Sequence, residues 1–172
     1  MTSNKTKRLA TALVLLLASN AWALQSDQSQ PIEIQADNGM LDQGKQVTVF
    51  TGNVVVKQGS IDIKAARIEV QRTADGSQLM TATGSPVAFK QQLDEGKGWV
   101  NGHAQKVTYQ SASGLITLIG NAKVQRGGDV VQGNNITYNT KTEIYTAAGS
   151  KAASGSGRRV TVVLQPSSTQ KK

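Results

Sequence analysis

The chain has 172 residues and a formal charge of +8, from 19 Lys and Arg against 11 Asp and Glu, and it contains no cysteine. The length is typical of one domain, and the lack of cysteine excludes disulfides, a thiol nucleophile and a Cys-ligated zinc site. With His103 as the single histidine, we expect no histidine-based metal site or catalytic triad. The composition predicts no metal, no cofactor and no enzyme.

Residues 1–23 have the features of a cleaved secretory signal peptide. Three basic residues within 5–8 precede an apolar run at 9–18, and Ala-Trp-Ala at 21–23 matches the small-x-small cleavage pattern. The apolar run has about half of the ~20 residues that span a bilayer. We therefore expect an exported protein rather than an anchored one.

The rest of the chain is predicted to be all-β. From Ile32 onward, apolar and polar residues alternate with a period of two, as in Ile61-Asp62-Ile63, which is typical of strands with one face toward a core. Clusters of Gly, Asn, Asp and Ser separate these runs and favour turns. The domain is expected at 24–166, followed by a disordered polar tail at 167–172.

Two short motifs recur along this domain. A small residue that opens an alternating segment occurs at positions 36, 65, 104 and 133, and a glycine that opens another occurs at Gly52, Gly84 and Gly120. Units of this kind stack on their neighbours into a solenoid-like or rolled sheet, and glycines permit the bends. The sequence therefore predicts an array built from repeats.

The two ends of such an array are expected to be strands that can pair. The first runs from Pro31 to Ala36 and the last from Arg159 to Leu164. Unpaired strand edges either aggregate or accept a strand from a partner. The expected edge residues are Pro31, Ile32 and Ile34 at one end and Val160, Val162 and Leu164 at the other.

The sequence gives little support for a catalytic site. Asp94 and Glu95 lie in a polar stretch typical of a solvated turn, and no carboxylate lies in an apolar stretch that would raise its pKa for acid catalysis. His103 occupies a repeat position that carries Lys64 and Gln132 in other copies, which indicates a surface strand position. An exported polysaccharide-acting enzyme with an open β groove stays as an alternative that needs converging acidic residues.

The basic residues are spread at about one lysine per strand, at Lys57, Lys64, Lys90, Lys106, Lys123 and Lys141. Nucleic-acid binding would need clustered basic residues with aromatics between them, and export separates the protein from nucleic acid. Two interpretations of these lysines stay open. They form a solvated face, or their positive electrostatic field helps to hold an anionic ligand such as a phosphorylated lipid head group. The apolar faces likewise fit a packed core or a sheet open enough to hold an apolar ligand.

Several segments of the chain carry a family resemblance: 30–37, 49–61, Gly102-His103-Ala104 with Tyr109, 118–122, 133–138 and 158–164. Together they closely resemble the LptA (OstA-like) family of periplasmic lipopolysaccharide-transport bridge proteins. Their order is colinear, and the resemblance covers about residues 28–166.

The resemblance implies a single twisted, open β-jellyroll of many antiparallel strands with an apolar interior groove. It also implies a protein that binds lipopolysaccharide by lipid A, joins other copies head to tail and bridges the inner and outer membranes from the periplasm. The implied partners are an inner-membrane-anchored LptC-like component and the N-terminal domain of an LptD-like outer-membrane translocon. A self-assembling structural β-solenoid without lipid cargo is the alternative.

The same resemblance assigns the lipid-contacting side chains to Ile32, Ile34, Phe89, Tyr109 and Leu118. Their alternation fits one inward face. For each of them, ordinary core packing is an equally good explanation.

Overall fold

The computed structural model describes residues 27, 30–93, 98–139, 141–142, 144–150, 157 and 159–166. The predicted signal peptide at 1–23, Asp94-Glu95 and the tail at 167–172 lie outside these residues. Among the described residues, no helix has the length and hydrophobicity needed to cross a bilayer. The elements are β1 (Glu33–Gln35), β2 (Asn38–Asp42), β3 (Val47–Gln58), β4 (Ile61–Arg72), β5 (Gln78–Gln92), β6 (Trp99–Gln110), β7 (Leu115–Arg126), β8 (Asp129–Asn139), β9 (Ile144–Ala148) and β10 (Thr161–Val163).

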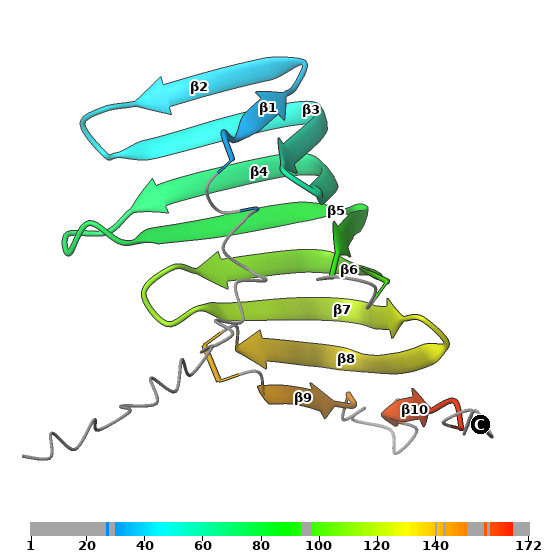
Figure 1. Ribbon diagram of the computed structural model, residues 1–172. Helices are drawn as coiled ribbons and strands as arrows, with labels where there is room; N and C mark the ends of the chain where they lie inside the picture. Colours follow the sequence, from blue (N-terminus) through cyan, green and yellow to red (C-terminus); the bar gives the residue numbers. More distant parts are fainter. Residues whose placement is uncertain are drawn as a thin grey trace, which may run out of the picture.

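All ten strands belong to one antiparallel sheet in the order β1-β3-β4-β5-β6-β7-β8-β10. In addition, β2 pairs with β3 and β9 pairs with β8, so each end of the sheet is formed by two short strands on one long strand. The long strands are stacked in chain order, with the first and last strands at opposite ends of the stack (Figure 1). The predicted all-β, open, antiparallel architecture is confirmed.

Each long strand is bent near its middle. Every ladder from β3–β4 to β7–β8 has a register shift there, for example between Thr51 and Val54 and between Ile119 and Ala122. The Gly-Asn pairs of the second motif supply two of these bends: Gly52 and Gly120 have φ of 80°, and Asn53 and Asn121 have φ of 46° and 48°. Positive φ is a conformation that Gly adopts freely and that Asn tolerates. The sequence repeat therefore marks the bend.

The bend divides the sheet into two arms. The first arm consists of residues 47–51, 67–72, 78–83, 106–110, 115–119 and 135–139, with β2 and β9 on its edges. The second arm consists of residues 54–58, 61–65, 87–92, 99–104, 122–126 and 129–133, with β1 and β10 on its edges.

The core lies at the bend, where the inner faces of both arms meet. Ile68 and Ala82 of the first arm and Val54 and Val87 of the second arm have no exposed surface, and they belong to one apolar cluster. Burying a side chain such as Ile68 contributes about 1.5–3 kcal/mol. The small residues of the first repeat, Ala65, Ala104 and Gly133, lie beside the bend, where the backbones of neighbouring strands approach closely.

Candidate functional site: the inner face of the bent sheet

Side chains of neighbouring strands that share a register position lie on one face of the sheet. The row nearest the bend in the first arm is fully apolar and closed to solvent at its centre: Leu118 is 2% and Ile136 1% exposed. The complete row is Phe50, Ile68, Ala82, Val107, Leu118, Ile136 and Ala147. This row belongs to the packed core.

The next row outward on the second arm is the second-arm rim. Its side chains are apolar, most of them are half-buried, and those between β1 and β8 belong to the buried core or pack against it. From one end of the sheet to the other, the row is Ile34, Val56, Ile63, Phe89, Gly102, Val124, Val131 and Val162. The row is therefore free of polar side chains from one end of the stack to the other.

The first arm has an equivalent row, the first-arm rim. It mixes apolar and polar side chains: Leu41, Thr48, Val70, Met80, Tyr109, Ile116, Tyr138 and Tyr145. At its N-terminal end it borders an open hollow of about 360 Å³, whose lining includes Leu41, Thr48 and Val70 of this rim together with Arg72 and Gln78.

The predicted lipid-contacting residues divide among these places. Ile34 and Phe89 lie on the second-arm rim and Tyr109 on the first-arm rim, so these three share the inner face without being direct neighbours. Ile32 precedes β1 and is 60% exposed. Leu118 is buried in the core row, where packing accounts for it. That these five contact a lipid stays a prediction.

The predicted edge residues lie at the two ends of the sheet. Ile34 and Val162 are the central residues of β1 and β10, which are the end strands of the pairing order. Val160 and Leu164 flank β10, Pro31 and Ile32 precede β1, and all four are exposed. The end strands are shorter than the sequence suggests, because the paired part is Glu33–Gln35 rather than 31–36 and Thr161–Val163 rather than 159–164.

The lysines are less evenly spread than the sequence indicates. Lys57, Lys64, Lys90 and Lys123 share the outer face of the second arm, whereas Lys106 lies on the first arm. His103 belongs to the same outer row as Lys64 and Gln132, as expected for a surface strand position.

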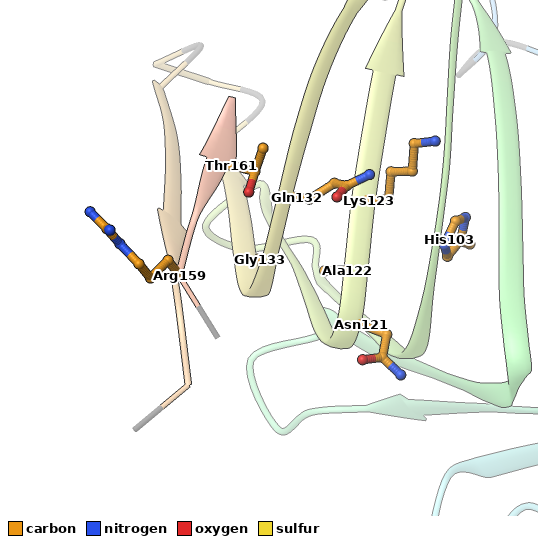
Figure 2. A pocket seen from close by; sticks show the side chains of 8 residues that line it. All are labelled: His103, Asn121, Ala122, Lys123, Gln132, Gly133, Arg159 and Thr161. Atoms are coloured by element: carbon orange, nitrogen blue, oxygen red, sulfur yellow. The ribbon is translucent and has the colours of Figure 1, made fainter. Parts of the chain in front are cut away.

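An open hollow of about 540 Å³ on this outer face is lined by His103, Lys123 and Arg159 among others. Figure 2 shows Arg159 extending away from Lys123 and His103, so the three basic groups do not converge on one point. Within the described ranges, no three His, Asp or Glu side chains gather in a way that could hold a metal ion.

One polar contact near the N-terminus has no signal in the sequence. The carboxylate of Asp27 accepts hydrogen bonds from Ser60 N at 2.8 Å, from Ser60 Oγ at 2.7 Å and from Gln91 Nε2 at 3.2 Å. Partial burial raises the pKa of Asp27, but the bonds from Ser60 and Gln91 together outweigh it and leave the pKa below its ordinary value. Asp27 thus ties the segment before β1 to the β3–β4 turn and to β5.

Comparison with known proteins agrees with this architecture. Residues 33–144 match the family model described as LptA/(LptD N-terminal domain) LPS transport protein. The lipopolysaccharide export system protein LptA of Haemophilus influenzae is 42% identical over 99% of this chain and 96% of its own length. LptA of Escherichia coli K12 is 39% identical over 98% of this chain and 91% of its own length.

A solved structure has the same fold. The crystal structure of Pseudomonas aeruginosa LptH, the LptA-homologous periplasmic component of its lipopolysaccharide transport device, superposes with a TM-score of 0.70 at 31% identity. The match covers 82% of this chain and 99% of that structure. The chain therefore belongs to the LptA/LptD N-terminal-domain family of lipopolysaccharide transport proteins.

Proposed function

We propose that this protein is a periplasmic lipopolysaccharide carrier. It shelters the fatty chains of the lipid against the inner face of the bent sheet and joins similar units end to end into a bridge between the two membranes. The named activities of its relatives support this role. The observation that carries it is the second-arm rim, an apolar row that continues from β1 to β10 and most of whose members stay partly exposed beside the buried core.

The physical argument concerns the cost of wetting acyl chains. Each CH₂ transferred out of water is worth about 0.8 kcal/mol, so a lipid with several chains faces a barrier of tens of kcal/mol if it crosses water bare. A continuous apolar row removes much of that barrier without chemistry. The protein acts as a conduit rather than an enzyme, and partners supply the energy for directed transport.

The ends of the sheet support assembly by strand addition. β1 and β2 form one end and β9 and β10 the other, so each end offers two short strands, one per arm. A strand edge of this kind accepts a further antiparallel strand through backbone hydrogen bonds. The partners at the two ends are an inner-membrane-anchored LptC-like component, an LptD-like N-terminal domain, or further copies of this chain. The signal peptide at 1–23 delivers the protein to the periplasm.

The test compares inner and outer side chains that are adjacent in sequence. Phe89→Asp and Ile34→Asp place a charge on the second-arm rim, whereas their neighbours Ala88→Asp and Gln35→Asp place it on the other face. With lipopolysaccharide micelles and gel filtration, the inner variants are expected to lose most co-elution while the outer variants keep it. Equal co-elution of all four variants, with circular dichroism unchanged, would exclude this inner face as the lipid site.

The structural solenoid without lipid cargo is the second candidate, because the same end strands would serve it. Deleting residues 160–172 separates the two functions. A carrier becomes monomeric and still binds lipopolysaccharide, whereas a scaffold loses its assembly and never binds lipid. The polysaccharide-acting enzyme has less support, since neither the core row of the first arm nor either rim carries a carboxylate.

A further inference from the structure

The two ends of the sheet hold most of the large apolar side chains that the fold leaves exposed. Among the described residues, every such side chain except Trp99 lies in an end strand or next to one. They are Ile32, Met40 and Leu41 at the β1–β2 end and Ile144, Tyr145, Val160, Val162, Val163 and Leu164 at the β9–β10 end. Apolar surface gathered in this way is typical of a contact with another protein.

The strand directions make the two ends complementary to each other. Every ladder from β1 to β10 is antiparallel, so β10 runs opposite to β1 on the second arm and β9 runs opposite to β2 on the first arm. A second copy whose β1–β2 end meets the β9–β10 end continues the antiparallel sheet on both arms at once. Two like ends cannot do this, because a rotation that reverses the stacking direction also reverses the strand direction or the inner face.

The apolar pattern alone leaves the register of this contact open. A slip of one residue turns inner side chains outward, whereas a slip of two keeps them inward. Val162 of β10 can lie opposite Ile34 of the next copy, or opposite Ile32 or Ala36, which are two residues to either side. Because all three registers keep apolar side chains on the inner face, a further feature is needed to select one.

Charge selects the register that continues the second-arm rim. With Val162 opposite Ile34, Arg159 of one copy lies opposite Asp37 of the next, because each is three residues further along its antiparallel strand. A slip of two residues in either direction sets Arg159 opposite a Gln or a Gly instead. Opposite charges at directly opposed positions stabilise the pairing of two strands.

Both side chains are exposed, and neither forms an ion pair with another described residue. Arg159 extends away from the other basic residues of its hollow and toward the end of the stack (Figure 2). The carboxylate of Asp37 accepts a hydrogen bond of 2.9 Å from Asn53 at the bend of β3, and Arg159 lines its hollow together with Asn121 at the bend of β7. The register that pairs the charges therefore also brings the bends of adjoining units side by side.

We propose that an ion pair between Arg159 of one copy and Asp37 of the next sets the register in which units of this protein join. This inference rests on the proposed end-to-end assembly and names the residues that align the rims of two copies. An exposed ion pair contributes little to affinity, but a like charge at the same place opposes a wrong partner or register. The pair acts mainly on specificity.

Charge reversal tests the pair, because a mixture of two variants can recover what each has lost. Arg159→Glu and Asp37→Arg each set like charges opposite one another when a variant meets itself. In sedimentation velocity, each is expected to associate severalfold more weakly than the unmodified protein. In an equimolar mixture, the acidic end of one variant meets the basic end of the other, and association is expected to return.

Glu33→Arg is the matched control, because Glu33 is an exposed acid of the same end that lies opposite Val163 in this register. Alone it is expected to associate as the unmodified protein does. Combined with Arg159→Glu in one chain, it is expected not to restore association. Restoration by Glu33→Arg, or none in the mixture with Asp37→Arg, would overturn the pair.

The absence of cysteine allows a second measurement that does not depend on charge. Thr161 and Gln35 are exposed and directly opposed in the proposed register, where Cα atoms are about 4.5–5.5 Å apart and within reach of a disulfide. Oxidation of mixed Thr161→Cys and Gln35→Cys chains is expected to give a linked pair, and Thr161→Cys with Glu33→Cys to give much less. The opposite order would overturn the register.

Failure of this inference differs from failure of the carrier function. If the charge and cysteine variants contradict the register while the unmodified protein co-elutes with lipopolysaccharide, only the ion pair is refuted. An unmodified protein that never self-associates refutes the ion pair together with assembly of this chain from its own copies. Loss of co-elution with the unmodified protein would refute the carrier function itself.

Discussion

The ring of Phe89 on β5 lies directly over Gly102 on β6, so close that a Cβ at residue 102 would be 2.7 Å from two of its ring carbons. The same Cβ would lie 2.4 Å from the carbonyl oxygen of Lys123 on β7. The missing side chain at Gly102 therefore leaves the space that the ring of Phe89 occupies on an otherwise aliphatic rim.

Gly102→Ala is expected to destabilise the protein by about 1–3 kcal/mol, because both the ring and a neighbouring backbone must move. Gly39→Ala is the matched control, since its Cβ would meet the ring of Phe50 at an ordinary 3.5 Å. That control is expected to be neutral or to stabilise by about 0.4–1 kcal/mol through the unfolded chain. Urea unfolding of both variants is the measurement, and equal midpoints would contradict the close contact.

Leu118 and Phe89 are expected to respond differently to truncation. Leu118→Ala leaves a cavity in the sealed core row and should cost about 2–5 kcal/mol of unfolding free energy. Phe89→Ala removes a ring that is only half-buried beside the core, so its stability loss should be the smaller one and its loss of lipopolysaccharide affinity the larger one. Denaturant unfolding and lipid titration of the same two samples test this, and the reverse order would place lipid contact in the core.

The hydrogen bonds of Asp27 predict that the stability of the protein decreases at acidic pH. Because the folded-state pKa of Asp27 is lowered, its ionised carboxylate adds to the free energy of unfolding. This contribution is fully present above the unfolded-state pKa near ~3.9 and is lost as the pH falls through the folded-state pKa. Asp27 is only partly buried and water screens its carboxylate, so Asp27→Ala should cost only a few tenths of a kcal/mol at neutral pH. Thermal unfolding curves of the two proteins should converge once the pH is below the lowered folded-state pKa of Asp27. A stability difference that grows on acidification would refute this assignment.

The end strands predict a surface for self-association. Val162→Lys places a charge in the middle of β10, where Val162 is 51% exposed, and lysine on an edge strand opposes the addition of another chain. Stability should change by no more than about 0.5 kcal/mol, while sedimentation velocity should show a weaker concentration dependence of association. Gln71→Lys, exposed on the central strand β4, is the control and should associate as the unmodified protein does. Identical association of both variants would remove β10 from the interface.

The sequence predicts the strands and the bends well, because both depend on local signals. Alternation identifies the long strands, and Gly52-Asn53 and Gly120-Asn121 mark bends that need positive φ. The first strand ends sooner than predicted, since Asp37 N donates to Gly52 O and opens the separate β2–β3 ladder just after Ala36.

How deeply a side chain is buried, and which residues far away in the sequence it contacts, could not be predicted in the same way. Alternation places Leu118 and Tyr109 on the same face, but only the position of the bend decides that Leu118 joins the core row and Tyr109 the rim. The partner of Asp27 is Ser60, which is 33 residues away, and the alignment of three tyrosines depends on the register of four strands. Such relationships arise from the pairing of strands with one another, and the sequence of a single strand does not determine it.

The central claim is that the inner face of the bent sheet, and not its outer face, shelters the fatty chains of lipopolysaccharide. Photo-crosslinking tests it most directly, with a benzophenone amino acid placed at Phe89 or Tyr109 and, as controls, at the adjacent outer positions Ala88 or Thr108. Irradiation in cells should yield lipopolysaccharide adducts at residues 89 and 109 and few or none at 88 and 108. Equal yields at adjacent positions, or adducts only at 88 and 108, would contradict the claim.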